Sequence, residues 1–314
     1  MASSENKKSR KDQILRICKV VFLAAVAVFL VRFFTTNITQ IRELDFKINW
    51  PVFAASMIFY FIYKVTLASF WHYITVLDHA NIRYGEALTA YLYSILGKYI
   101  PGKVFMLAAR FPAYEREGVP LRKVTVCFFI ENICTLLGAA FLFLISLFFF
   151  PNSILEDYRI VTVLLVVAFF ICLNPKIINF FLKYVEKVAK KKDIQIPFTY
   201  GQMLKVVGLF ILNWLIVGTG FYILTCSMYR LPVSELLFAG GIYGLSAIIG
   251  ILAIFTPSGL GVREGILVLG LSLVMPKEMA VIISIVSRLW ATVAELILVL
   301  GAFLVKKFSE ARRR

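Results

Sequence analysis

The sequence predicts an all-α polytopic membrane protein with about six spanning helices and two broken, re-entrant helical hairpins, arranged as an inverted repeat. Of the 314 residues, 60% are hydrophobic and mean hydropathy is +0.84, whereas soluble domains are usually nearer half apolar. Several apolar runs reach the about 20 residues that a helix needs to cross a hydrocarbon core. Inside lipid the backbone must satisfy its own hydrogen bonds, so these runs must be helices.

The apolar pattern predicts spanning helices at residues 14–36, 52–75, 121–150, 157–173, 204–228 and 278–305. Two further apolar regions, 86–109 and 235–275, are each interrupted. The pieces that follow the breaks are too short to cross at about 1.5 Å per residue. We therefore expect each region to form one hairpin, and the residues that break the helices are Pro101, Gly102, Pro257, Gly259 and Gly261.

The net charge of +16 does not indicate a nucleic-acid partner, because most basic residues flank the apolar runs, as the positive-inside rule expects. This distribution predicts a multi-pass protein of the cell (inner, cytoplasmic) membrane with both termini in the cytoplasm. Residues 1–13 and 306–314 are then basic cytoplasmic tails around one membrane domain, 14–305. A basic amphipathic segment, 174–203, is expected to lie on the cytoplasmic leaflet.

The same charge rule makes the first hairpin begin and end inside and the second begin and end outside. The two half-repeats then cover about 52–150 and 204–305. After each break a charged residue appears within a long helix, Glu131 in one half and Arg288 in the other. In transporters built from inverted repeats, paired broken helices of this kind mark the substrate site.

Charged residues near the second break are candidate substrate ligands. Arg263 and Glu264 begin the half-helix, where backbone N–H groups favour an anion and an arginine adds a planar fork suited to phosphate. The alternatives are an internal Arg263–Glu264 pair and a rim charge. Arg288 and Glu295 lie deep in the last helix, where charges are costly and usually face partners. Their alternative role is a structural pair, for example Arg288 with Glu131.

The first half supplies further candidates. Lys64 lies at the middle of helix 52–75, from which a lysine reaches water with difficulty. Lys98, Lys103 and Arg110 belong to the first hairpin, and lysine suits phosphate as a point charge. The alternative for these three is an ordinary cytoplasmic rim charge. The five cysteines and two histidines form no metal-binding pattern, so we expect no metal, cofactor or catalytic residue.

Three motifs resemble the lysylphosphatidylglycerol synthase transmembrane-region family. They are GKYIPGKV at 97–104, PSGLGVREG at 257–265 and SRLW at 287–290, and the resemblance covers nearly the whole chain. Relatives often carry an acidic–Arg pair in the first long helix and a Trp–basic pair late in the second. Here these positions are Glu131-Asn132 and Trp71-His72. The missing arginine argues against a strict charge relay at Glu131.

The resemblance implies a flippase-like translocator of lipids with charged headgroups. Lipid aminoacylation belongs to a separate soluble domain in two-part relatives, and we expect no room for one here. The favoured function is movement of an anionic or aminoacylated phospholipid, or of a polyprenyl-phosphate-linked lipid, between leaflets. The alternatives are an integral-membrane glycosyltransferase or lipid-modifying enzyme, and an accessory subunit of a lipid synthase. A synthase or glycosyltransferase is thus an expected partner, beside membrane lipids themselves.

Overall fold

The computed structural model describes residues 47–99, 104–150, 159–180, 198–253, 259 and 261–311. All of them belong to one compact unit, Phe46–Arg314. The predicted helix 14–36 lies outside the described residues, as do residues 181–197 of the predicted amphipathic segment 174–203. Residues 175–180 of that segment form a short helix, and 200–203 begin the next long helix. Four residues named in the sequence predictions, Pro101, Gly102, Lys103 and Pro257, also lie outside the described residues.

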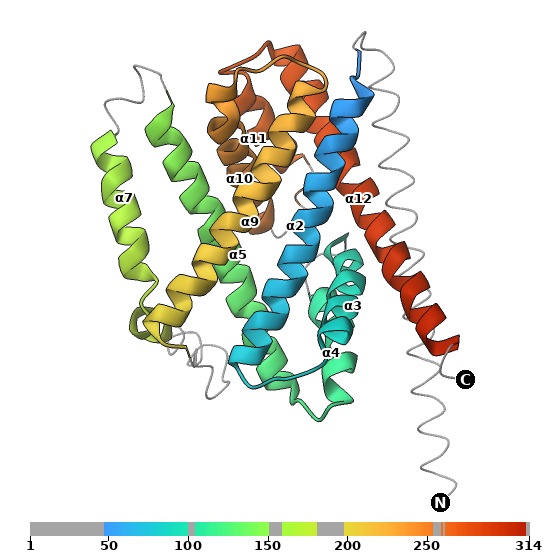
Figure 1. The fold of residues 1–314 in the computed structure, drawn as a ribbon. Coiled ribbons are helices and arrows are strands. Elements are labelled where there is room, and N and C mark those ends of the chain that lie inside the picture. The colour runs from blue at the N-terminus through green and yellow to red at the C-terminus, as the bar shows by residue number, and fades with distance from the viewer. Residues whose placement is uncertain are drawn as a thin grey trace, which may run out of the picture. The chain divides into compact units, whose positions relative to one another are not determined.

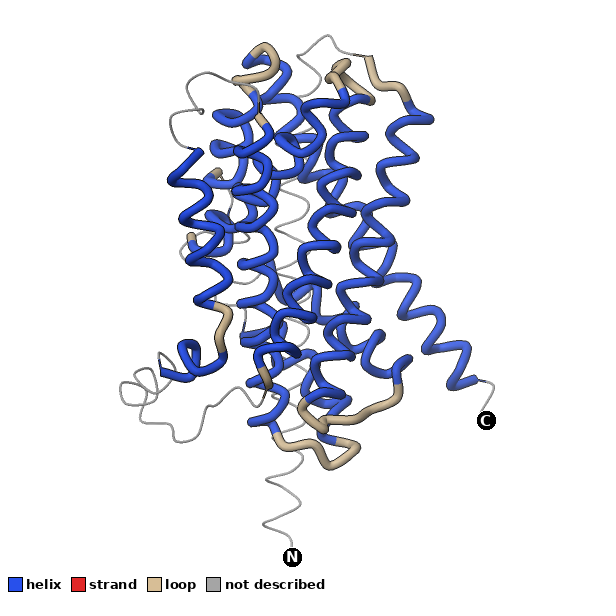
Figure 2. Tube along the Cα trace, turned by 60° about the vertical axis from the view of Figure 1, so that its left-hand side comes forward, coloured by secondary structure: helices blue, strands red, loops and turns tan. Residues whose placement is uncertain are grey.

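Within the described ranges every regular element is a helix (Figures 1 and 2). Four predicted spans are confirmed as long apolar helices: α2 (Trp50–Leu77), α5 (Leu121–Phe149), α9 (Tyr200–Cys226) and α12 (Lys277–Ala311). A fifth apolar segment, Val233–Leu252, is also long enough to cross a membrane. It joins a 3-10 turn, η2 (Val233–Glu235), to α10 (Leu236–Leu252).

Within the predicted span 157–173 the described residues form helix α7 (Arg159–Cys172), of 14 residues. The residues just before Arg159 lie outside the described part of the chain. The apolar side chains of α7 are exposed on most sides, including Ile160, Leu164 and Ile171. α7 therefore lies at the edge of the helical bundle, where it packs against α5.

Local sequence signals explain where the long helices begin. Before α9, the Thr199 hydroxyl accepts from the Gln202 N–H at 3.3 Å, and the Gln202 side chain accepts from the Thr199 N–H at 2.8 Å. This reciprocal cap satisfies two N–H groups that the helix itself leaves unpaired. Before α2, the Asn49 side chain accepts from the Val52 N–H at 3.4 Å, and a proline stands in the first turn.

Each interrupted region folds into two packed helical arms. The first comprises α3 (Tyr84–Ser94), a 3-10 turn η1 (Ile95–Tyr99) and α4 (Val104–Glu115), and the second comprises α10 and α11 (Val262–Leu271). Near both breaks, glycines allow the backbones of the two arms to pack closely against each other. A Cβ on Gly97 would lie 2.6 Å from the Met106 backbone nitrogen, and one on Gly259, whose φ is +70°, would lie 2.7 Å from the Gly250 Cα. Larger residues would force these arms apart.

The two hairpins enter the bundle from opposite ends (Figure 1). The end of α2 and the start of α5 lie together at one end of the bundle. There the Lys123 ammonium donates a hydrogen bond to the Asp78 carbonyl at 3.0 Å. At the other end the Asn49 N–H before α2 donates to the Ser227 carbonyl after α9 at 2.8 Å. The first hairpin connects α2 to α5, and the second connects α9 to α12. The sidedness in a membrane and the division into half-repeats stay predictions.

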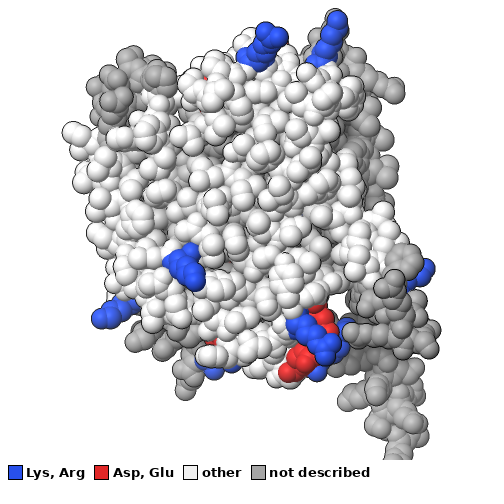
Figure 3. All heavy atoms as spheres, viewed as in Figure 1, with Lys and Arg blue, Asp and Glu red and all other residues white. Residues whose placement is uncertain are grey.

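The surface fits a membrane environment. On the face in Figure 3 the charged side chains gather toward the two ends, and most of the area between them is uncharged. Large apolar side chains are exposed along the long helices, for example Ile58 on α2, Leu212 on α9 and Ile297 on α12. The predicted class, an all-α polytopic membrane protein, is therefore confirmed.

Candidate functional site

Two predicted cations meet at the carboxylate of Glu295, which α12 holds fully buried. The Lys64 ammonium lies 2.9 Å from Glu295 Oε1, and the Lys98 ammonium contacts Oε2. The Tyr60 hydroxyl donates a further hydrogen bond to Oε1 at 2.8 Å. One buried carboxylate thus binds cations from α2 and from the tip of the first hairpin.

The local fold explains this convergence. Tyr60 and Lys64 are four residues apart on α2 and therefore lie on the same helix face. Lys98 lies in η1, at the tip of the hairpin whose arms close tightly at Gly97. Its side chain keeps 25% exposure, whereas that of Glu295 keeps 1%. Lys98 is therefore the more accessible of the two cations, since the Lys64 side chain keeps 11%.

The second hairpin brings a further arginine and an ion pair. Arg263, in the first turn of α11, places its guanidinium 4.5 Å from the centre of the Tyr243 ring. Glu264 accepts from the Gly261 N–H at 2.8 Å and also pairs with Arg288 on α12. Gly261 has φ +80°. Glu264 therefore forms its ion pair with Arg288 on α12, and not with the adjacent Arg263, which was one of the alternatives.

One tryptophan on α12 joins the two groups. The Tyr60 ring lies 4.6 Å from the Trp290 ring, edge to face, and the Tyr243 ring lies 6.3 Å away on the same indole. We call the combined set the central cluster. Its charged members are Lys64, Lys98, Arg263, Glu264, Arg288 and Glu295. Among these described residues four cations face two carboxylates, which leaves a net charge of +2.

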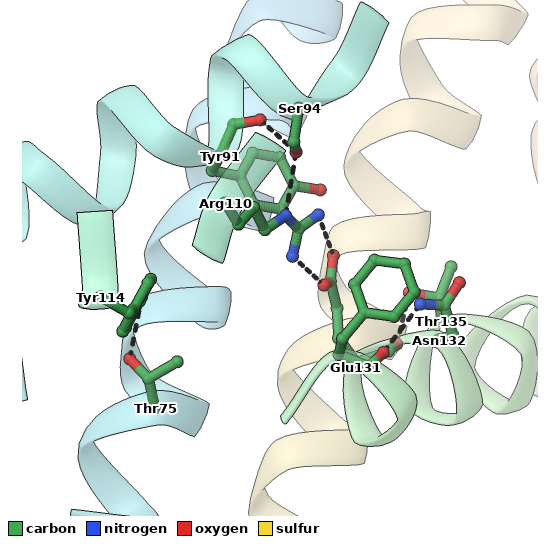
Figure 4. Close-up of polar contacts among 9 residues, drawn as sticks. Thr75, Tyr91, Ser94, Arg110, Tyr114, Glu131, Asn132 and Thr135 are labelled. Atoms are coloured by element: carbon green, nitrogen blue, oxygen red, sulfur yellow. Dashed lines mark hydrogen bonds and ion pairs between the residues drawn. The ribbon is translucent and has the colours of Figure 1, made fainter. Parts of the chain in front are cut away.

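A second buried pair lies elsewhere (Figure 4). Arg110 on α4 is 0% exposed and pairs with Glu131 on α5, its Nη2 lying 3.4 Å from Oε1. Its Nε donates to the Ser94 hydroxyl on α3 at 2.9 Å. Its guanidinium also lies 4.2 Å from the Trp71 ring and 4.3 Å from the Tyr91 ring.

The structure decides two alternatives that the sequence left open. Glu131 pairs with Arg110 and not with Arg288, which pairs with Glu264. Arg110 is buried and not a rim charge, because α4 folds back beside α3 and carries it inward against α5. The residue next to Glu131 is Asn132, whose amide donates to the Phe128 carbonyl at 2.7 Å. The arginine beside Glu131 therefore comes from the hairpin.

Sequence reasoning missed several site residues. It named no tyrosine as a candidate, yet Tyr60 binds Glu295 and the Tyr243 ring lies against the Arg263 guanidinium. The available signal was spacing, because Tyr60 precedes Lys64 by one helical turn. Of the predicted residues, Lys64, Lys98, Arg263, Glu264, Arg288 and Glu295 lie in the central cluster, while Glu131 lies in the separate pair with Arg110.

Comparison with known proteins places this geometry in a family. A family model described as the lysylphosphatidylglycerol synthase TM region matches residues 16–299. A search among curated proteins found no match. The matched range includes both hairpins, the whole central cluster and the Arg110–Glu131 pair, and it supports a role connected with membrane lipids. The chain therefore belongs to the lysylphosphatidylglycerol synthase transmembrane-region family.

Proposed function

We propose that the protein is a flippase-like translocase of lipids whose headgroup carries negative charge. The substrate class is the predicted one: anionic or aminoacylated phospholipids and polyprenyl-phosphate-linked lipids. The observation that carries the proposal is the charge of the central cluster. Its four cations exceed its two carboxylates within a part of the molecule that lies between long apolar helices.

Excess positive charge at such a depth needs a counter-ion. Charges buried without partners cost several kcal/mol, about 3–5 kcal/mol when one member of a buried pair is removed. Glu295 is shared between Lys64 and Lys98, and among the described residues no carboxylate is within ion-pair distance of Arg263. A lipid phosphate would supply the missing negative charge. Lysine and arginine both suit phosphate, the first as a point charge and the second as a fork.

The opposed hairpins favour movement of the bound headgroup. Lys98 comes from the hairpin that enters at one end of the bundle, and Arg263 comes from the one that enters at the other. Lys98 contacts Glu295 of α12, and Arg263 packs on Tyr243, whose ring lies 6.3 Å from Trp290 of α12. A headgroup held between them would be released to either end if the hairpins moved alternately. We propose that Glu295 holds Lys64 and Lys98 together before the lipid binds. The phosphate then takes over part of its contacts while the acyl or prenyl tails stay in the bilayer.

Reconstitution in liposomes tests this proposal. Vesicles that contain the protein should equilibrate a fluorescent anionic phospholipid across the bilayer faster than protein-free vesicles, as measured by chemical quenching of the outer leaflet. Lys64→Gln should slow this transfer by about tenfold or more, because it removes a charge-assisted contact worth about 1.5–3 kcal/mol. Transfer no faster than in empty vesicles would refute the proposal.

Lys205 offers a matched control. It is an exposed lysine on α9, its ammonium 5.3 Å from the Tyr73 ring, while that of Lys64 lies 5.0 Å from the Tyr63 ring. Lys205→Gln removes the same charge outside the central cluster and should leave transfer unchanged. Arg263→Gln provides a second variant within the cluster, in case Lys64→Gln is poorly folded. Equal losses in Lys205→Gln and Lys64→Gln would show that only surface charge matters.

A further inference from the structure

Trp290 is a buried tryptophan whose polar atom is unpaired. Its side chain is 1% exposed, and its Nε1 has no hydrogen-bond partner among the residues that the structure describes. An unpaired buried donor typically costs about 1–3 kcal/mol. The fold does satisfy another tryptophan of the same bundle, because Trp214 Nε1 donates to the Thr135 carbonyl at 2.8 Å.

The packing of Trp290 fixes its ring. The Tyr60 and Tyr243 rings both lie at 71° to the indole plane, at 4.6 and 6.3 Å. The far edge of the six-membered ring lies against α9, where a Cβ on Gly220 would come within 3.5 Å of it. The indole therefore packs against residues of α2, α10 and α9.

The neighbours of Trp290 define the chemistry of its partner. Tyr60 is bonded to Glu295, which holds Lys64 and Lys98, and Tyr243 lies under Arg263. The indole N–H is a donor only, so it requires an acceptor such as an oxygen. A lipid phosphate meets this requirement, because its oxygens accept hydrogen bonds and its negative charge suits the cations of the central cluster.

We propose that the Trp290 indole N–H donates a hydrogen bond to a phosphate oxygen of the lipid headgroup and helps to determine which lipids bind. This inference rests on the proposed function and adds a specific, uncharged contact to the cations of the central cluster. The cations attract any anion, whereas the fixed N–H selects one whose oxygen reaches that position. Lipids without a headgroup phosphate should lose this contact.

The test uses the full-length protein in detergent and dihexanoyl phosphatidate as the probe. Trp290→Phe keeps an aromatic ring but removes the N–H, and it should weaken phosphatidate binding by about tenfold, as loss of a hydrogen bond to a charged acceptor predicts. The matched control is Trp71→Phe. Trp71 is also fully buried, with an Nε1 that has no hydrogen-bond partner within the described residues, but it packs on Arg110, which is paired with Glu131. Its variant should bind phosphatidate like the wild type.

A spectroscopic measurement avoids dependence on a variant that folds poorly. In protein labelled with ¹⁵N at the indole nitrogens, the Trp290 N–H signal should move downfield when phosphatidate is added, and the Trp71 signal should stay in place. Inorganic phosphate at the same concentration forms the second arm. An equal shift with inorganic phosphate would show that the phosphate group alone is recognised, and a shift with phosphatidate only would show recognition within a lipid.

Two results would overturn the inference. One is equal phosphatidate affinity in the wild type and Trp290→Phe, and the other is a Trp290 signal that neither probe moves. Lipid transfer by the wild type in liposomes would still stand in either case, so failure of this inference is distinguishable from failure of the proposed function.

Discussion

The molecule buries two groups of charged residues, and they differ in how completely their charges cancel. Arg110 and Glu131 form one cation and one carboxylate, with Ser94 completing the polar contacts of the guanidinium and Trp71 and Tyr91 packed beside it. The central cluster instead has an excess of cations around Glu295 and Glu264. The first group is closed within the protein, while the described residues of the second carry an excess of positive charge, which a lipid phosphate neutralises in the proposed function.

This difference separates a structural ion pair from the proposed binding site. Burying an ion pair is costly, and good geometry with additional hydrogen bonds offsets that cost. Arg110 meets this condition by binding α3 and α5 at once, so it fixes the first hairpin to the bundle. The central cluster draws its residues from both hairpin tips and from α2 and α12. Its members are held less completely, as the 25% exposure of the Lys98 side chain illustrates.

The largest expected effect comes from breaking the closed pair. Glu131→Gln should reduce the free energy of unfolding by about 3–5 kcal/mol, because it leaves the Arg110 guanidinium buried without a counter-charge. Thermal unfolding in detergent would measure the loss. The double variant Arg110→Met with Glu131→Leu should recover most of it, because an apolar pair of similar volume avoids the desolvation of both charges. A Glu131→Gln protein as stable as the wild type would contradict the closed-pair interpretation.

A smaller loss is expected when the first hairpin is pushed apart at its tip. Gly97→Ala places a Cβ 2.6 Å from the Met106 nitrogen and should cost about 1–3 kcal/mol through overpacking. It should also slow lipid transfer, because Lys98 is the next residue. Gly85→Ala on α3 is the control, since a Cβ there meets no atom within 4 Å. If both variants behaved alike, the tight closure at Gly97 would not matter for the central cluster.

The smallest expected effect tests directly whether the central cluster, and not the Arg110–Glu131 pair, binds an anion. Glu295→Gln removes one negative charge from the central cluster and should tighten binding of anionic lipid by about tenfold, which corresponds to about 1.4 kcal/mol. Added dihexanoyl phosphatidate should therefore raise the unfolding temperature of Glu295→Gln more than that of the wild type. Glu131→Gln should show no such extra gain. If phosphatidate raised the unfolding temperature of both variants by the same amount, the central cluster and the Arg110–Glu131 pair would not differ in anion binding.

Much of the fold was predictable because its signals are local. Hydropathy located α2, α5, α9 and α12, and proline and glycine located the breaks in the two hairpins. Within the predicted span 157–173, the described residues Arg159–Cys172 form helix α7. For the site, the sequence predicted the charged residues but not their partners. The cost of charge in apolar helices identified Lys64, Arg288 and Glu295 as residues that need partners, but gave no means of choosing those partners.

The sequence by itself determined which segments are apolar helices, where they break and which charges are buried among them. These properties depend on the side chains of a short stretch and on the demand of lipid for satisfied backbone groups. Only the tertiary structure decided the pairing: Arg110 with Glu131, Arg288 with Glu264, and Lys64 and Lys98 with Glu295. Pairing depends on which helix faces meet, and groups such as Tyr60 and Glu295, 235 positions apart, are brought together by packing alone.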